Sequence, residues 1–406
     1  MKTIQSILTA VILCLSITSK AQTDTTFNSG NLQLNGTISI PSGNGPFPLV
    51  IMAHGSGPND RNETFTPTGT NGACLYPNMV NETSVMFQDI ADSLAIAGIA
   101  TFRYDKRTYT HGSSLNPTTI LVHDFADDLS AAVDFMKLHP SIDIEQIYLL
   151  GHSQGSNFIP VVAIERNDIN GLISMGGNTT PIDTILARQN RDIAYMCNQD
   201  TAAGDQYYND ILTAMGMVRN GSWPNNQALL GAYEPFWKSW IDLTDSVIYN
   251  YNSANLPLLV LQGDADFNVP PTEVTPFNGL DQNLTTVEEF DGLNHFFNDG
   301  DNPQTNSDVI TTIINWILDT QTGIKNLDEK SSINWTIYNN TVIIDSEKTQ
   351  NLTLEIFDLM GRQIAQKNMQ NSNQIRINST IQTGVYIATV KSNGAIIESR
   401  KIYLNQ

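Results

Sequence analysis

The stretch "YLLGHSQGSNF", residues 148–158, decides how the rest of the chain is interpreted. An apolar run ends at Leu150, and Ser153 then stands between Gly151 and Gly155. A buried strand that leads through a tight turn into a helix is the setting in which a serine hydroxyl projects above a sheet. The two glycines would relieve the crowding in such a turn. The stretch therefore predicts a reactive Ser153, and a purely structural turn is the alternative.

Apolar runs and helical segments alternate along most of the chain. Apolar runs fall at residues 47–53, 147–150, 172–175 and 256–261, and further strands are predicted at 99–104 and 286–290. Helical spacing of apolar residues falls at 86–97, 125–138 and 309–318. Strands without alternation are covered on both faces. The order predicts an α/β fold with a mainly parallel sheet and helices on both faces. Residues 32–40 alternate instead, which predicts an antiparallel edge strand.

Composition divides the chain into four parts. Residues 1–21, with a lysine start, an apolar run and a small-residue cleavage site, predict a secretory signal peptide. Residues 22–320 would form the α/β domain, in which the aromatic-rich residues 178–255 have the length of a helical cap over a site; packing decoration is the alternative. Residues 321–332 have the composition of a linker. The period-two pattern of residues 333–406 predicts a small all-β sandwich.

The charge and hydropathy of the chain exclude several classes of protein. The formal net charge is −20, so no basic surface for nucleic acid is expected. After the signal peptide, no apolar run approaches the roughly 20 residues of a membrane span. No pattern predicts a metal or a cofactor; the acidic residues 297–308 match the spacing of no known calcium loop.

Two cysteines, Cys74 and Cys197, remain once the signal peptide is removed. In an oxidising compartment they could form a disulfide. Nothing in the sequence shows that they lie close together, so the pairing stays open.

A serine needs a base before it can act as a nucleophile. The chain has six histidines. If the order along the chain is serine, acid, histidine, only His295 lies after Ser153. His295 follows the predicted strand at 286–290, on a loop from which it could reach over the edge of the sheet. The sequence therefore predicts His295 as the base.

The base in turn needs a carboxylate to orient it. The stretch "LQGDADFNV", residues 261–269, offers Asp264 and Asp266 after a predicted strand. Asp266 is preferred because it lies three residues past Gly263, on the turn. We expect Asp264 to be a capping or solvated residue, and Asp291 is a third choice.

Backbone N–H groups must stabilise the oxyanion that forms. The predicted donors are Gln154, which follows the serine, and Ser56, in the glycine-containing loop after the first buried strand. We expect His54 to be a packing residue that holds this loop. The charged residues at 60–61 and 103–107 are expected to form ion pairs near the rim of the site.

The motifs "HGSGPNDR" (54–61), "FRYDKR" (102–107), "LLGHSQG" (149–155), "LQGDADFNV" (261–269) and "GLNHFF" (292–297) resemble those of the α/β-hydrolase superfamily. They are most similar to its exported bacterial serine esterases and acyl-peptidase-like enzymes. The resemblance covers about residues 30–320 apart from the insertion. It implies a cofactor-free Ser-His-Asp triad and a small-molecule ester or peptide substrate. Many relatives carry another glycine where this chain has Ser156, which puts the helix packing near the turn in doubt.

The motifs "EIFDLMGRQI" (355–364) and "GVYIATVKSNG" (384–394) resemble the C-terminal sorting domain of the type IX (Por) secretion system of Bacteroidetes. This resemblance covers about residues 331–406. It implies that the type IX machinery is a partner and that the protein is secreted or held at the cell surface. A carbohydrate-binding sandwich is the alternative, but Trp335 is the only tryptophan available for a sugar platform.

Together these features predict a secreted serine hydrolase that cleaves carboxylic esters of short to medium acyl length through an acyl-enzyme. A serine peptidase of the prolyl-oligopeptidase or aminopeptidase type is one alternative, for which Glu234 and Asp242 could bind an amine terminus. A non-catalytic surface binding protein is the other.

Overall fold

A computed structural model of the chain describes residues 21–321, 333–338, 341–358, 362–378, 381–392 and 395–404. Except for Ala21 and Gln321, the predicted signal peptide and the predicted linker lie outside these residues.

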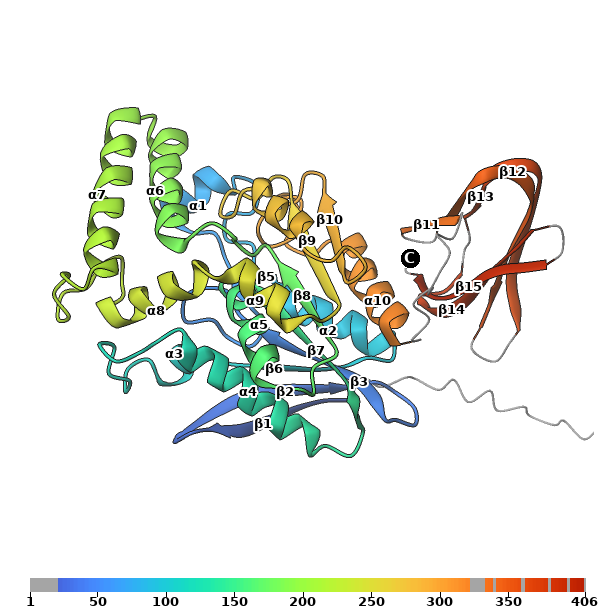
Figure 1. Ribbon diagram of the computed structural model, residues 1–406, viewed down its shortest axis with the longest axis horizontal. Helices are drawn as coiled ribbons and strands as arrows, with labels where there is room; N and C mark the ends of the chain where they lie inside the picture. The colour runs from blue at the N-terminus through green and yellow to red at the C-terminus, as the bar shows by residue number, and fades with distance from the viewer. Residues whose placement is uncertain are drawn as a thin grey trace, which may run out of the picture.

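An eight-stranded sheet forms the centre of the larger part (Figure 1). Its strand order is β1 (Ala21–Ser29), β2 (Leu32–Ile40), β6 (Ala100–Tyr104), β3 (Phe47–Ala53), β7 (Ile142–His152), β8 (Gly171–Met175), β9 (Leu258–Gly263) and β10 (Thr285–Phe290). The neighbours from β6 to β10 pair in parallel, whereas β1 pairs with β2 and β2 with β6 in antiparallel orientation. The prediction of a mainly parallel sheet is confirmed.

The predicted edge strand is not at the edge. Residues 32–40 do form β2, but β1 pairs along its whole length and takes the edge position. Most side chains of β1 are exposed and polar, and Phe27 and Ser29 are its buried residues. Such a strand has no apolar pattern, and for that reason the sequence analysis missed it.

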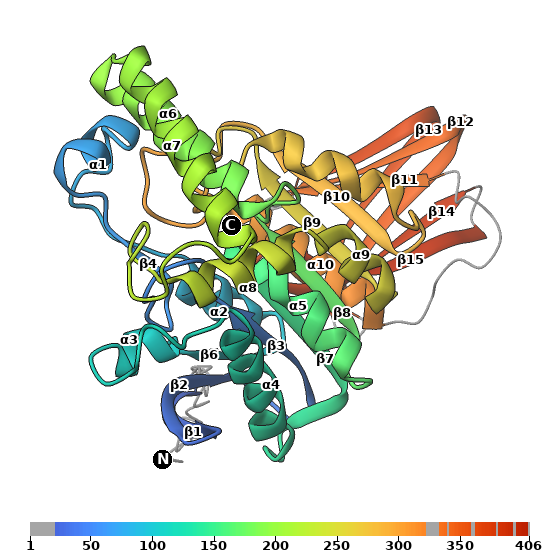
Figure 2. The same cartoon turned by 60° about the vertical axis from the view of Figure 1, so that its left-hand side comes forward.

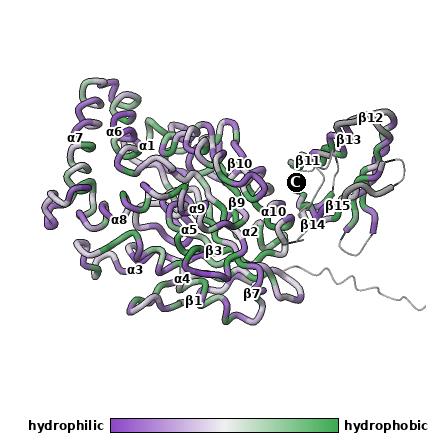
Figure 3. The backbone as a smooth tube through the Cα atoms, in the orientation of Figure 1, coloured by the Kyte–Doolittle hydropathy of each residue, from purple (hydrophilic) through white to green (hydrophobic). Residues whose placement is uncertain are grey.

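Helices cover both faces of the sheet. The helices α2 (Met86–Ile96) and α10 (Ser307–Gln321) pack on one face, against side chains such as Val50 and Met52. The helices α4 (His123–Lys137) and α5 (Gln154–Glu165) pack on the other face, against Leu49 and Ile51. Successive residues of β3 are thus buried on opposite sides, which explains the unbroken apolar run there (Figure 3).

The insertion between β8 and β9 contains four helices. They are α6 (Ile182–Asn198), α7 (Thr201–Arg219), α8 (Glu234–Thr244) and α9 (Val247–Ala254). Helices α6 and α7 form a hairpin that extends away from the sheet, while α9 packs on α5 (Figure 2). A disulfide between Cys74 and Cys197 joins α1 (Gly69–Leu75) to α6, which resolves the pairing that the sequence left open.

Short elements complete this part of the chain. They are β4 (Thr64–Phe65), β5 (Ser84–Val85), α3 (Arg107–His111) and the 3-10 helix η1 (Pro271–Gly279).

The C-terminal part is an antiparallel sheet with a hydrophobic core of its own. Its strands are β11 (Ile333–Tyr338), β12 (Thr341–Phe357), β13 (Gln363–Asn378), β14 (Gly384–Ser392) and β15 (Ala395–Leu404). Strand β12 pairs with β13 along most of its length, and the register of this pairing shifts between Asp345 and Leu352. Strand β15 lies on α10, where the N–H of Tyr403 donates to Asn315 Oδ1 at 2.8 Å.

Candidate active site

Ser153 stands on a strained turn between β7 and α5. Its backbone φ is 51° and its ψ −115°, a conformation that non-glycine residues rarely adopt. A Cβ atom on Gly151 would lie 2.5 Å from the carbonyl carbon of Gly155, and one on Gly155 would overlap the carbonyl oxygen of Ala53. The two glycines are therefore required by space as well as by the turn. Ser156 fits in this packing because its Oγ donates to the carbonyl of Gly151 at 2.6 Å.

His295 and Asp266 form a buried hydrogen-bonded pair. The distance from His295 Nδ1 to Asp266 Oδ2 is 2.7 Å, and both residues are at most 5% exposed. The carboxylate also accepts from the N–H of Val269 at 2.8 Å and from Gln262 Nε2 at 3.1 Å. These contacts fix Asp266 in the orientation in which it meets the imidazole ring.

The other two carboxylates that the sequence offered lie elsewhere. Asp264 is exposed and accepts from the N–H of Gly292 at 2.6 Å, as expected of a capping residue. Asp291 is exposed as well. Neither Asp264 nor Asp291 takes the place of Asp266 beside His295.

The three residues singled out by the sequence follow strands that end at one edge of the sheet. Ser153 comes after β7, Asp266 after β9 and His295 after β10, and the carboxyl ends of parallel strands meet at one edge. Within the described residues 21–321, no hydrogen bond joins Ser153 Oγ to His295. Catalytic hydrogen bonds of this kind are often long before a substrate is bound.

Both expected oxyanion donors lie beside Ser153. Gln154 is the first residue of α5, where the N–H has no acceptor within the helix and lies at the positive end of the helix dipole. Ser56 is in the loop after β3. That loop passes close to the serine, because a Cβ on Gly55 would lie 3.3 Å from the Cβ of Ser153.

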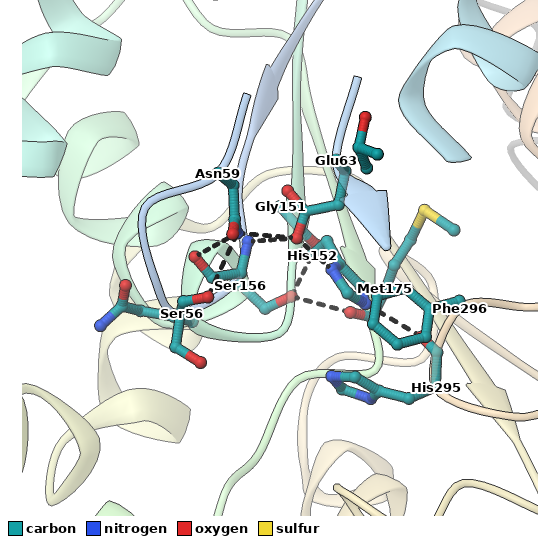
Figure 4. Close-up of polar contacts among 12 residues, drawn as sticks. Ser56, Asn59, Glu63, Gly151, His152, Ser156, Met175, His295 and Phe296 are labelled. Atoms are coloured by element: carbon teal, nitrogen blue, oxygen red, sulfur yellow. Dashed lines mark hydrogen bonds and ion pairs between the residues drawn. The ribbon is translucent and has the colours of Figure 1, made fainter. Parts of the chain in front are cut away.

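A second buried pair, Glu63 and His152, was missed by the sequence analysis. Glu63 Oε1 lies 3.0 Å from His152 Nδ1 and accepts from the N–H of Gly55 at 3.0 Å, and His152 Nε2 lies 2.9 Å from the carbonyl oxygen of His295 (Figure 4). Burial would raise the pKa of Glu63, but the hydrogen bond and charge of His152 outweigh it and hold that pKa below its usual range. The pair thus connects the Gly55 loop to the His295 loop. Its members are 89 residues apart, so no local pattern could reveal it.

The rim charges pair differently from the prediction. Arg61 pairs with Asp105 at 3.0 Å rather than with Asp60, whose carboxylate accepts from nearby backbone N–H groups. Arg107 pairs with Asp128 at 2.8 Å.

Lys106 and His54 are both buried, and the position of Lys106 differs from the rim position expected for it. Lys106 is 3% exposed and donates to the carbonyl of Gly55 at 2.6 Å and to Gln154 Oε1 at 2.7 Å. His54 packs between the rings of Phe87 and Tyr104, which agrees with the packing role expected for it. Burial lowers the pKa of His54 to about 4.

A cavity of about 450 Å³ opens beside Ser56 and Gln154. Its walls come from the loop after β3, from α3 to α5 and from the insertion, and include the aromatic residues Phe125, Phe236, Trp237 and Trp240. The rings of Trp237 and Trp240 stack at 5.7 Å. Its lining residues include no aspartate or glutamate. In the described part of the chain, no group of three or more His, Cys, Asp or Glu side chains is placed to hold a metal ion.

The doubly covered parallel sheet and the strained serine turn define the α/β-hydrolase class. Residues 71–299, more than half of the chain, match the family described as "Serine aminopeptidase, S33", and the chain belongs to this family. Residues 338–405 match the family described as "Secretion system C-terminal sorting domain". Both resemblances noted in the sequence are thereby confirmed, and the sorting domain indicates that the protein is exported to the cell surface or beyond.

Individual relatives add detail. Esterase EstD of Thermotoga maritima is 28% identical over 277 residues, which are 67% of this chain and 60% of that protein. This chain therefore spans less than two thirds of the length of that relative.

Two solved structures with similar chains are Est1E from Butyrivibrio proteoclasticus and the acylaminoacyl peptidase of Pyrococcus horikoshii. The first is 16% identical with a TM-score of 0.46 over 74% of this chain and 99% of that chain. The second is 14% identical with a TM-score of 0.45 over 73% and 41%. No helix in the described residues of this chain is both long and apolar enough to span a membrane.

Proposed function

We propose that this protein is an exported carboxylic ester hydrolase whose triad is Ser153, His295 and Asp266. The observation that carries the proposal is the buried 2.7 Å contact between His295 and Asp266, at the same edge of the sheet as the strained turn of Ser153. A carboxylate on Nδ1 leaves Nε2 of the ring free to act as a base.

The proposed reaction proceeds in two halves. His295 Nε2 takes the proton of Ser153 while Oγ attacks the acyl carbonyl, and the N–H groups of Gln154 and Ser56 stabilise the oxyanion. His295 then gives the proton to the leaving alcohol, and an acyl-enzyme remains. Water attacks this ester with His295 again as base, which releases the carboxylic acid and restores Ser153.

The cavity accommodates the acyl part of the substrate. Its lining includes both oxyanion residues, Ser56 and Gln154, but neither His295 nor Asp266. The leaving alcohol must lie within hydrogen-bond reach of His295, so the cavity on the oxyanion side receives the group that stays on Ser153. Its aromatic walls favour apolar acyl groups of short to medium length.

Ester cleavage is favoured over aminopeptidase activity by the absence of acidic residues from the lining of this cavity. An enzyme that holds a free α-ammonium group needs a carboxylate near the acyl side. Glu234 and Asp242 do not line the cavity, and Asp242 pairs with Lys238. The ionisable residue that does line it is Lys106, which would repel an ammonium group.

The remaining parts of the chain have roles that follow from this activity. Residues 22–320 form the catalytic unit, with residues 178–255 as a cap over the cavity, to which Leu186, Trp237 and Trp240 contribute. Residues 333–406 are recognised by the type IX secretion machinery, after residues 1–21 have directed the chain out of the cytoplasm.

The test compares the protein with its Ser153→Ala variant. Both would be assayed on p-nitrophenyl acetate, butyrate and octanoate, and on aminoacyl- and Gly-Pro-p-nitroanilides. We expect ester turnover that the substitution abolishes. Faster turnover of the anilides would favour the peptidase, and equal rates for the two proteins on every substrate would favour a non-catalytic binding protein.

A further inference from the structure

Lys106 is a buried cation for which the proposed reaction has no role. It follows β6 directly, at the start of α3, and its side chain runs beneath the loop after β3 toward the start of α5. Its ammonium group lies 4.3 Å from the centroid of the Phe125 ring and faces the acyl cavity. Burial of a lysine destabilises the folded protein unless neighbouring groups stabilise its charge, since desolvation disfavours the ammonium form.

The ammonium group contacts Gln154, one of the proposed oxyanion donors, and Gly55, the residue before the other donor, Ser56. Nζ donates to the carbonyl of Gly55 at 2.6 Å and to Gln154 Oε1 at 2.7 Å. One side chain thereby joins the loop after β3 to the first residue of α5, two segments about a hundred residues apart in the sequence.

The contact with Gly55 sets the direction of the Ser56 N–H. The carbonyl of Gly55 and the N–H of Ser56 belong to one peptide unit, and in a planar trans peptide they point in opposite directions. The carbonyl of Gly55 accepts from Lys106 and also from Asn59 Nδ2 at 3.2 Å. A cation that holds this carbonyl therefore turns the N–H of Ser56 away from the ammonium group. On its other side the loop is held by the N–H of Gly55, which donates to Glu63 Oε1 at 3.0 Å.

We propose that Lys106 is a positioning residue for the oxyanion hole, which it orients through the Gly55–Ser56 peptide and the Gln154 side chain and to which it lends positive charge. The inference rests on the proposed ester hydrolysis. It assigns a role to a residue that the sequence analysis placed in an ion pair at the rim.

The charge on Lys106 depends on pH in the range where the enzyme would work. Burial lowers the pKa of Lys106 to about 7, although the carboxylates of Glu63 and Asp128 raise it. Two other ionisable groups lie near Lys106. The charge of Lys106 helps to lower the pKa of His54, and Arg107 forms an ion pair with Asp128. Above pH 7 the ammonium group loses a proton, so oxyanion stabilisation should weaken as pH rises.

The decisive experiment measures kcat/KM for p-nitrophenyl butyrate from pH 5.5 to 9.5 in the full chain and its Lys106→Met variant. In the unmodified protein we expect an alkaline decline with a midpoint near 7. In Lys106→Met we expect kcat/KM to fall by roughly 10- to 100-fold, mainly through kcat, and the alkaline decline to disappear. Lys137→Met, which removes a charge paired with Asp168 on the outer end of α4, should change neither quantity.

Wild-type values of kcat/KM and an unchanged alkaline decline in Lys106→Met would overturn the proposal. If that variant does not fold, Gln154→Met decides instead, since it removes one acceptor of the ammonium group and keeps the backbone N–H. Its alkaline decline should then move to lower pH, and an unmoved decline would overturn the proposal. Failure of the esterase itself is recognised separately, by hydrolysis that Ser153→Ala does not abolish.

Discussion

At the scale of single residues, the proposed site depends on which of two neighbouring aspartates is buried beside His295. Asp266 receives three hydrogen-bond donors in a buried position, one of them His295, whereas Asp264 two residues earlier is exposed and binds the N–H of Gly292. The two aspartates therefore differ in their hydrogen-bond partners, and their replacement should affect the rate of ester hydrolysis differently.

Replacement of Asp266 by asparagine should lower kcat/KM for esters by roughly 10⁴-fold, because an amide cannot hold His295 in the tautomer that leaves Nε2 free. The matched control is Asp264→Asn, which should keep the activity within about threefold, as expected for a residue outside the reaction. Steady-state kinetics of both variants, with circular dichroism to confirm folding, would check this. Greater loss of activity in Asp264→Asn would contradict the assignment.

The three proposed triad residues could be predicted because each follows a strand that the sequence predicts, and the order of the strands brings their ends together. Lys106 and the pair of Glu63 and His152 could not be predicted. The partners of Lys106 lie 48 and 51 residues away, and Glu63 and His152 are 89 residues apart. An isolated charge in a loop is usually solvated. The sequence therefore points to the proposed reacting groups but not to the hydrogen-bonded network around them.

At the scale of elements, apolar pattern and length explain both the correct predictions and the errors. Residues 147–150 of β7 are a continuous, fully buried apolar run, so the existence of this strand was evident. Strand β1 has polar, mostly exposed side chains and is held by its backbone pairing with β2, so no pattern marked it. The disulfide could not be predicted because 123 residues separate its cysteines.

The disulfide between α1 and α6 ties the insertion to the rest of the α/β part. Closing a loop of 123 residues is worth up to about 5 kcal/mol in the chain-entropy model. The double variant Cys74→Ser/Cys197→Ser should therefore unfold several degrees below the unmodified protein in scanning calorimetry. Reductant should lower the unfolding temperature of the unmodified protein and leave that of the double variant unchanged; equal unfolding temperatures without reductant would contradict this role.

At the scale of the whole molecule, the C-terminal sheet contacts the α/β part at α10, on which β15 packs (Figure 1). Strand β15 lies on α10 through Tyr403, which is 2% exposed, and Arg400 lies 3.6 Å from Asp319. The proposed triad instead lies at the carboxyl edge of the sheet. Sorting and catalysis are thus expected to be independent.

A chain that ends at Gln321 should keep kcat/KM for esters within about twofold of the full chain, since distant sites act independently. Its unfolding temperature should be slightly lower, because the face of α10 under Tyr403 becomes exposed. Kinetics and calorimetry on the two chains would show this. A folded but inactive short chain would mean that the C-terminal sheet contributes to the site.

The central claim is that Ser153 forms a covalent intermediate with the help of His295, and covalent labelling tests it most directly. The protein would be treated with a p-nitrophenyl alkylphosphonate and its peptides mapped by mass spectrometry. The account predicts one adduct per chain, on Ser153 and not on Ser156, and a much slower reaction in His295→Ala. Ester turnover that continues with Ser153 unlabelled, or an adduct on another residue, would contradict it.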